Sequence, residues 1–275
     1  MSQTPPSVSI IIPAYNEQAT IRSCLLAAVM QTVAATEIIV VDNRSTDATA
    51  EVVRSVMAEH PTAPIRLIAQ NDEQGLIPTR NLGLDTATGD VLGRIDADSI
   101  LEPNWVEQVR LAFADDSIAA ATGPVLYYDM PLRRFGLRAD DRTRRVILKL
   151  SRDYHFLFGS NMAIRASAWR EIRGEVCRDH ADLMHEDIDL SIHLAQHDLK
   201  ATYVSEMVSG MSARRLEDSP RDYAFYVNRF DRTYASHRLR NPMLRAPMVV
   251  FFFIYPLAKL MRSMKQRNDR IDARK

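Results

Sequence analysis

Short apolar runs rich in β-branched residues recur along the first hundred residues, and polar segments with helical periodicity separate them. Runs of this length and composition are typical of strands that are buried on both faces. They lie at Val8–Tyr15, Glu37–Asp42, Ile65–Gln70 and Val91–Ala97. Strands that alternate with helices form right-handed βαβ units, so we expect a doubly wound, mainly parallel sheet of the α/β class.

Helix-start signals follow the first three of these strands. Asn16 is placed to cap the first helix and Ser45 or Thr46 the second, and Pro78 stands near the start of a third helix that should end by about Ala87. In such sheets ligands bind outside the carboxyl ends of the strands. We therefore expect the functional residues at that edge.

The pattern beyond the fourth strand gives weaker predictions. It indicates a helix over 103–113, strands within 118–128 and a short helix over 165–174. The arginine-rich stretch 128–155 shows no clear period, and we expect irregular structure there. Segment 185–199 alternates partly like a strand, but acids at its front and histidines toward its back fit a helix aligned with its dipole, so we predict a helix.

Charge is distributed unevenly along the chain. The 275 residues hold 35 Lys and Arg against 35 Asp and Glu, a net charge of zero that argues against a generally basic nucleic-acid binder. Residues 238–275, however, hold ten Lys and Arg against two aspartates and carry +8, which leaves −8 on residues 1–237. We expect one domain over 1–237 and a basic tail over 238–275 that meets something anionic.

The tail also contains a strongly apolar run. Ala246–Met261 is shorter than the roughly 20 apolar residues that a membrane span needs. A basic-flanked apolar segment of this kind suits a peripheral anchor in the cytoplasmic leaflet of a plasma membrane. The alternative is a helix that packs on the domain or on a dimer partner.

Cysteine usage and the N-terminus bear on the compartment. The chain has only Cys24 and Cys177, which is no disulfide scaffold, and residues 1–9 lack a basic segment followed by an apolar one. We expect a reducing, cytoplasmic location without a secretory signal.

Two acids close the fourth predicted strand. Asp96 and Asp98 are two residues apart, so their carboxylates should project to the same side of the strand end, near Tyr15 and Asp42 at the ends of other strands. Mg²⁺ and Mn²⁺ prefer oxygen ligands, and Mg²⁺ is commonly held by one or two carboxylates plus substrate phosphates. A divalent ion that carries a nucleotide diphosphate is one interpretation. Taken alone, the motif also fits two surface acids on a solvated turn.

Neither common phosphate-binding glycine motif is present. The first strand is followed by neither a G-x-G-x-x-G nor a G-x-x-x-x-G-K-[ST] pattern, which disfavours a nicotinamide dinucleotide fold and a P-loop. Instead the chain reads "VSIIIPAYNEQATI", "EIIVVDNRSTDAT", "GLIPTRNLGLDTATGDVLGRIDADS", "GSNMAIRASAW" and "HEDIDLSIHL" in that order. These five segments resemble the successive motifs of family 2 glycosyltransferases, which have the GT-A fold, over roughly residues 8–204.

The resemblance implies a nucleotide site at the first two strands. It assigns Pro13, Tyr15 and Glu17 to the base and ribose pocket, and Asp42 to the edge of a uracil. Asn43 stands where the family often has a second aspartate, so that contribution is not expected here.

The resemblance also implies how the diphosphate and metal are held. Arg80 would reach the nucleotide or its phosphates, Asp96 would contact ribose or metal, and Asp98 would bind the metal, Mg²⁺ or Mn²⁺. Arg214 and Arg215 follow a predicted strand, and we expect at least one to reach the diphosphate, the alternative being an exposed basic pair.

The catalytic base implied by the resemblance is Asp187. A sugar hydroxyl is a poor nucleophile until a positioned carboxylate takes its proton, although Glu186 and Asp189 are close enough in sequence to be confused with it. The loop from Gly159 to Asn161, together with Glu186, would lie near the donor sugar and acceptor. Four histidines could be metal ligands, but we expect them on the surface: His180, His185, His193 and His197.

These residues together predict an inverting, metal-dependent glycosyltransferase. It would use a nucleotide sugar, with UDP-sugars the first candidates, and a lipid-linked or polysaccharide acceptor at the cytoplasmic face of a membrane. Two alternatives remain at this point. A nucleotidyltransferase would need a glycine-rich basic first loop, which "IPAYNE" is not, and an inactive sugar-nucleotide-binding scaffold would have lost Asp98 or Asp187.

Overall fold

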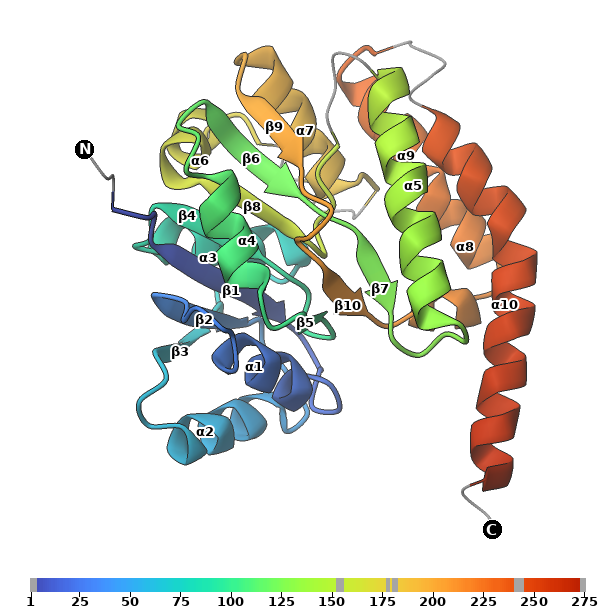
Figure 1. The fold of residues 1–275 in the computed structure, drawn as a ribbon, viewed down its shortest axis with the longest axis horizontal. Coiled ribbons are helices and arrows are strands. Elements are labelled where there is room, and N and C mark those ends of the chain that lie inside the picture. Colours follow the sequence, from blue (N-terminus) through green and yellow to red (C-terminus); the bar gives the residue numbers. More distant parts are fainter. Residues whose placement is uncertain (1–3, 152–155, 177–178, 180–182, 240–244, 273–275) are drawn as a thin grey trace.

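The structure, a computed structural model, describes residues 4–151, 156–176, 179, 183–239 and 245–272. A seven-stranded sheet in the order β3-β2-β1-β4-β8-β6-β9 forms its centre (Figure 1). All neighbours run parallel except β8, which is antiparallel to both β4 and β6. The predicted mainly parallel α/β sheet is therefore confirmed. The strands are β1 Val8–Ala14, β2 Glu37–Asp42, β3 Ile65–Ala69, β4 Val91–Arg94, β6 Ile118–Thr122, β8 Met162–Arg165 and β9 Lys200–Tyr203.

Alternating residues of β1 show how helices cover both faces of the sheet. Ile10 and Ile12 belong to one buried cluster with residues of α1, α2 and α4, whereas Ile11 belongs to another with residues of α3, α6 and α7. Complete burial of such a side chain contributes about 1.5–3 kcal/mol. The helices are α1 Ile21–Val29, α2 Thr49–Glu59, α3 Leu76–Thr86, α4 Trp105–Ala112, α6 Ala166–Ile172 and α7 Glu186–Gln196. The predicted helix at 185–199 is thus confirmed as α7.

The predicted helix caps are wrong, because those polar residues join two loops instead. Asn16 has a positive φ of 54°, and its Oδ1 accepts a hydrogen bond from the Thr46 backbone N–H at 2.8 Å. The Asn16 N–H in turn donates to Ser45 Oγ at 3.0 Å. These bonds fix the loops after β1 and β2 to each other, and both helices begin only after them.

A second sheet has three strands in the order β5-β10-β7. It lies near the carboxyl ends of the strands of the main sheet. Its strands are β5 Ile100–Leu101, β7 Val125–Tyr127 and β10 Ser209–Met211, and the 3-10 helix η1 Arg214–Glu217 follows β10. Asp129 accepts a hydrogen bond from the Ala213 backbone N–H at 2.9 Å, and the Tyr128 hydroxyl donates to the Asp98 carbonyl at 3.0 Å. This sheet therefore brings Arg214 beside the segment that follows β4.

The arginine-rich stretch expected to be irregular contains a long helix, α5 Arg133–Ser151. Ion pairs one turn apart support it, from Arg144 Nε to Asp140 Oδ2 and from Arg145 to Asp141 Oδ2, each at 2.6 Å. Pairs at this spacing stabilise a helix. The prediction was wrong because alternating charges on a helix leave little apolar period to detect.

The C-terminal region is helical and packs on the rest of the chain. It comprises α8 Pro220–Val227, α9 Arg229–Ser236 and α10 Ala246–Asp272. The ring of Tyr255 stacks on Tyr223 with centroids 4.0 Å apart, and the buried Arg262 pairs with Glu217 at 2.7 Å and with Asp129. One face of α10 thus rests on η1 and α8. No helix among the described residues combines the length and apolar character needed to cross a membrane.

Candidate active site

The strand ends gather several of the predicted site residues at one edge of the sheet. Tyr15 follows β1, Asp42 ends β2, and Asp96 and Asp98 follow β4. Because β8 runs in the opposite direction, the loop before it, with Gly159, reaches this same edge.

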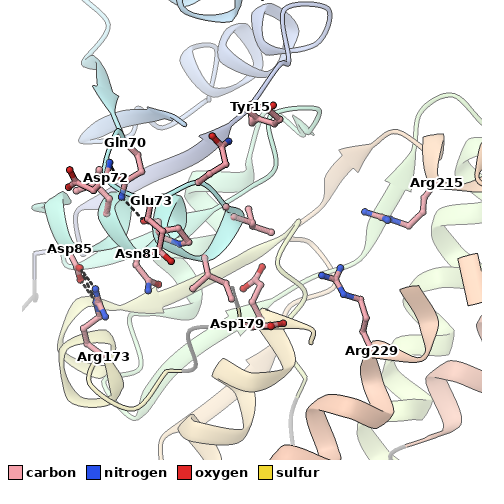
Figure 2. A pocket seen from close by; sticks show the side chains of 17 residues that line it. Tyr15, Gln70, Asp72, Glu73, Asn81, Asp85, Arg173, Asp179, Arg215 and Arg229 are labelled. Atoms are coloured by element: carbon pink, nitrogen blue, oxygen red, sulfur yellow. Dashed lines mark hydrogen bonds and ion pairs between the residues drawn. The ribbon is translucent and has the colours of Figure 1, made fainter. Parts of the chain in front are cut away.

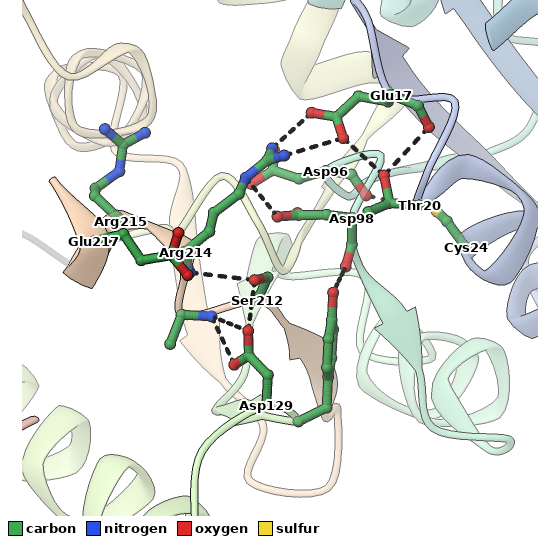
Figure 3. Close-up of polar contacts among 12 residues, drawn as sticks. Glu17, Thr20, Cys24, Asp96, Asp98, Asp129, Ser212, Arg214, Arg215 and Glu217 are labelled. Carbon is green, nitrogen blue, oxygen red and sulfur yellow. Dashed lines mark hydrogen bonds and ion pairs between the residues drawn. The ribbon is translucent and has the colours of Figure 1, made fainter. Parts of the chain in front are cut away.

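Asp98 is buried and paired with an arginine from a distant segment. It is 4% exposed, and its Oδ2 lies 3.2 Å from Arg214 Nε, while the same guanidinium binds Glu17 Oε1 at 2.6 Å (Figure 3). Burial raises the pKa of Asp98 to about 6, and the charge of Asp96 adds to this, although Arg214 opposes it. Arg214 is thus the cation that compensates Asp98 here, and it meets Glu17 rather than standing free on the surface.

The carboxylate of Asp98 fits a role as a metal ligand. Its second oxygen, Oδ1, is buried and has no hydrogen-bond partner among the described residues. A buried acceptor without a partner costs free energy, and a carboxylate oxygen is the ligand type that Mg²⁺ and Mn²⁺ prefer. Asp96, with its side chain 33% exposed, supplies a second oxygen donor two residues away.

A buried arginine that the sequence reading passed over links the two acidic motifs. Arg94, 2% exposed, binds Asp96 Oδ1 at 2.8 Å and Glu186 Oε1 at 3.1 Å. A charge inside an apolar strand needs such partners, and its presence in the buried run "VLGRIDA" was the signal that could have found it.

Arg80, which the resemblance assigns to the nucleotide or its phosphates, is buried beside Glu186. It is 0% exposed, pairs with Glu186 Oε2 and donates from Nη2 to Asn81 Oδ1 at 2.8 Å. Burial raises the pKa of Glu186, but Arg94 and then Arg80 outweigh it, so that the pKa is lowered overall. Arg80 holds Glu186 ionised and in place, and a direct contact with the nucleotide stays a prediction.

Asp187 occupies the first turn of α7 with a defined orientation. Its Oδ2 accepts from the Gly159 backbone N–H at 2.8 Å, and its Oδ1 accepts from the Ile188 N–H at 2.9 Å. Burial raises its pKa, and the neighbouring charge of Glu186 raises it further. A half-buried carboxylate with a raised pKa is suited to general-base chemistry near neutral pH.

The loop before β8 serves this arrangement in two ways. A Cβ at Gly159 would overlap the Arg94 guanidinium, so a larger residue here would displace that side chain. Asn161 is 0% exposed; its side chain accepts from Trp105 Nε1 at 2.8 Å and donates to the carbonyls of Pro124 and Met207. Asn161 therefore holds the loop from within, and its expected nearness to the sugars stays a prediction.

A pocket of about 570 Å³ opens between the strand ends and the C-terminal helices. Tyr15, Asn81 and Glu186 line it, and Arg215 and Arg229 face it from the other side (Figure 2). The Arg215 guanidinium lies over the Tyr226 ring, 3.9 Å from its centroid. The pocket thus joins a carboxylate-lined wall to a basic one.

The other residues assigned to the nucleotide at the first two strands, Pro13, Glu17 and Asp42, are not among those that line this pocket. Pro13 is buried inside β1 and does not line it, and Glu17 is held by Arg214. Asp42 Oδ1 is buried without a hydrogen-bond partner among the described residues. Asn43 binds the carbonyls of Gln70 and Glu73 and so holds the loop after β3.

The prediction of surface histidines is wrong at two positions. His185 and His193 are 7% and 8% exposed. His185 packs against the rings of Tyr226 and Phe230, and burial lowers its pKa to about 4. His197 is partly exposed, and His180 lies outside the described residues.

Comparison with known proteins places the chain in a family. The model of glycosyl transferase family 2 matches residues 9–173, and that of glycosyl transferase family group 2 matches residues 94–265. The chain belongs to glycosyl transferase family 2 and is a glycosyltransferase, as its sequence motifs predicted.

Curated relatives match about two fifths of the chain. Glycosyltransferase AglE of Haloferax volcanii is 34% identical over 110 residues, which are 39% of this chain and 36% of the relative. Chondroitin synthase of Escherichia coli is 36% identical over 111 residues, 40% of this chain but 16% of the synthase. The chain therefore matches well under two thirds of the length of these relatives.

Solved structures extend the likeness over the whole fold. Mannosyltransferase PcManGT from Pyrobaculum calidifontis, solved with GDP-Man and Mn²⁺, has a TM-score of 0.66 at 20% identity, over 98% of this chain and 76% of that one. Glucosyl-3-phosphoglycerate synthase from Mycobacterium tuberculosis, solved with Mn²⁺, UDP and glucosyl-3-phosphoglycerate, has a TM-score of 0.56 at 17% identity, over 86% and 82%. At identities this low, the structural likeness shows a shared fold, GT-A, and nothing more specific.

Proposed function

We propose that this glycosyltransferase moves a sugar from a UDP-sugar to a hydroxyl of a lipid-linked or polysaccharide acceptor, with inversion at the anomeric carbon. One observation carries the proposal. The buried Arg94 binds Asp96 of the D-x-D motif on one side and Glu186, the neighbour of Asp187, on the other. One buried cation thereby connects the motif suited to hold a diphosphate with the neighbour of the residue suited to activate an acceptor.

The nucleobase of the donor would bind at the ends of β1 and β2. Asp42 Oδ1 is a buried acceptor without a partner among the described residues, and Tyr15 is 52% exposed at the pocket. A carboxylate accepts hydrogen bonds and donates none when ionised, so it suits a base that presents an N–H on its edge. Uracil does so, and a panel of donors would also reveal a preference for guanine.

Asp96 and Asp98 would hold Mg²⁺ or Mn²⁺ together with the donor diphosphate. When bound, the ion supplies charge neutralisation for the departing diphosphate. Arg214 pairs with Asp98 and adds fixed positive charge there, and Arg215 adds positive charge to the pocket.

Asp187 would accept the proton of the acceptor hydroxyl. The hydroxyl oxygen then bonds to the anomeric carbon as the bond from that carbon to the diphosphate oxygen breaks, and the nucleoside diphosphate leaves with the electron pair. The hydrogen bond from Gly159 and the charge of Glu186 keep Asp187 oriented and basic.

The C-terminal residues 238–275, whose helix α10 packs on the domain formed by 1–237, would act as a peripheral membrane anchor. The face of α10 that points away from Tyr255 carries large exposed apolar side chains: Val249, Phe252, Phe253, Ile254, Leu257, Leu260 and Met264. Phe253 is 82% exposed. An apolar helix face beside surplus positive charge suits an anionic lipid surface, and we propose the cytoplasmic face of a membrane.

Incubation with a panel of nucleotide sugars and Mn²⁺ tests the proposed reaction. We expect release of nucleoside diphosphate above the buffer rate with at least one UDP-sugar, faster when a membrane lipid extract is added as acceptor. Binding of donors without release in the presence of acceptor extract would instead support a sugar-nucleotide-binding scaffold.

A further inference from the structure

A second group of metal-ligand side chains lies apart from the D-x-D motif. Asp189 and His193 are one turn apart on α7, and His237 follows the last residue of α9. One ligand atom from each of the three lies within 4.8 Å of the others. Asp189 and His193 are buried, and the side chain of His237 is 12% exposed. The sugar-transfer chemistry proposed above uses none of these three side chains.

The distances between these atoms suit a small tetrahedral ion. Asp189 Oδ1 is 2.7 Å from His237 Nε2 and 3.7 Å from His193 Nε2. Zinc bonds of about 2.0–2.2 Å at tetrahedral angles separate neighbouring ligand atoms by roughly 3.3–3.5 Å. The two observed separations lie on either side of that value, and all three ligand atoms lie within 4.8 Å of one another, so side-chain shifts on the order of 1 Å would seat an ion.

The second ring nitrogen of His193 also has the surroundings of a metal ligand. Its Nδ1 is buried, has no hydrogen-bond partner among the described residues, and lies 3.5 Å from Glu175 Oε2. A histidine that binds metal through one nitrogen usually donates its other N–H to a carboxylate. With Nε2 toward Asp189 and Nδ1 toward Glu175, His193 needs only a small ring rotation to do both.

We propose that Asp189, His193 and His237 bind a zinc-class divalent ion at a site separate from the donor site. Two imidazoles and one carboxylate favour Zn²⁺ and similar ions over Mg²⁺, which takes oxygen ligands. The ion would join the end of α9 to α7, the helix whose first turn holds Glu186 and Asp187. Its role is to hold the C-terminal helices against the catalytic helix.

Cobalt is the probe of choice, because Zn²⁺ has no visible spectrum. The test uses full-length protein without a histidine tag, stripped with a chelator, in an Asp98→Ala background that removes the D-x-D ligand. We expect one equivalent of Co²⁺ to bind with visible absorption bands and to be displaced by Zn²⁺. His237→Ala should weaken this binding at least tenfold, and Zn²⁺ should raise the Tm of the parent but not of this variant.

His197→Ala is the matched control, because His197 lies on the same surface and bonds Glu175 without belonging to the cluster. It should bind Co²⁺ as the parent does. His237→Gln keeps a hydrogen-bonding side chain and serves if the alanine variant does not fold. No stoichiometric binding by the parent, or equal binding by the His237 variants, would overturn the proposal and leave a hydrogen-bonded Asp189–His237 pair.

Discussion

The Nε atom of Arg214 lies 3.2 Å from Oδ2 of Asp98, so a guanidinium neutralises the carboxylate that we assign to the metal. Arg214→Gln removes this competing charge. We expect the variant to bind Mn²⁺ several-fold more tightly in the absence of nucleotide, and to bind UDP with Mn²⁺ about tenfold more weakly because a cation near the diphosphate is lost. Calorimetric titrations measure both affinities.

Arg221→Gln is the matched control, since Arg221 is exposed on α8. It should change neither affinity. If Arg214→Gln also left both affinities unchanged, Arg214 would have no part in the donor site.

Glu186→Gln should destabilise the fold. Glu186 pairs with two buried guanidiniums, those of Arg80 and Arg94. Loss of its negative charge leaves part of their positive charge without a buried partner. Breaking a buried ion pair costs about 3–5 kcal/mol, which for a chain of 275 residues lowers Tm by roughly 5–9 °C. Thermal unfolding followed by circular dichroism measures the change.

Glu59→Gln offers the comparison, because Glu59 pairs with Arg22 on the surface, with side chains 43% and 47% exposed. Exposed pairs contribute about 0–1 kcal/mol, so its Tm should hardly move. Equal effects of the two substitutions would mean that the Arg80–Glu186–Arg94 group does not stabilise the fold.

Metal binding should weaken at acid pH through Asp98. Burial raises the pKa of Asp98 from its ordinary value near 3.8 to about 6. The carboxylate is therefore protonated as the pH falls through about 6, and the proton then competes with the metal ion for this carboxylate. Affinity for Mn²⁺ should be about tenfold lower at pH 5 than at pH 7. Affinity that stays constant across this range would show that Asp98 is not a ligand.

The exposed face of α10 should govern binding to lipid. Phe252→Ser, Phe253→Ser and Leu257→Ser together remove apolar area that is solvent-exposed in the protein, so folding should persist. At low salt the parent should sediment with anionic vesicles, whereas most of the triple variant should stay in the supernatant. High salt should reduce the fraction of the parent that sediments.

Leu111→Ser is the control for that experiment, because Leu111 is 63% exposed on α4. It should sediment as the parent does. If the parent itself stayed in the supernatant with anionic lipid at low salt, the anchor proposal would fail, and the apolar face would serve contacts with protein.

Local sequence pattern predicted the sheet and the place of the site, because both depend on short-range signals. The β-branched runs mark β1 to β4, and parallel strands bring Asp42, Asp96 and Asp98 to one edge. The partner of Asp98, in contrast, is Arg214, 116 positions away, and only the second sheet brings the two together.

The helix-cap error arose because a polar side chain can find its partner at long range. Asn16 looked like a helix cap, but it bonds Thr46 in a neighbouring loop. Arg80 likewise pairs with Glu186 from α7, a partner 106 positions away that its place in the sequence does not indicate. Spacing along the chain contains no information on such partners until the fold is known.

The central claim, that Asp187 is the base of a sugar-transfer reaction, is tested most directly by Asp187→Asn. The amide keeps the shape of the side chain but cannot accept the hydroxyl proton. Release of nucleoside diphosphate from the preferred donor, with acceptor extract and Mn²⁺, should fall by about 10²–10⁴-fold while donor affinity stays within a few-fold of the parent. Asp198→Asn, an exposed position beyond the end of α7, should leave both unchanged. Near-normal release by Asp187→Asn would contradict the assignment and make Glu186 or Asp189 the candidate base.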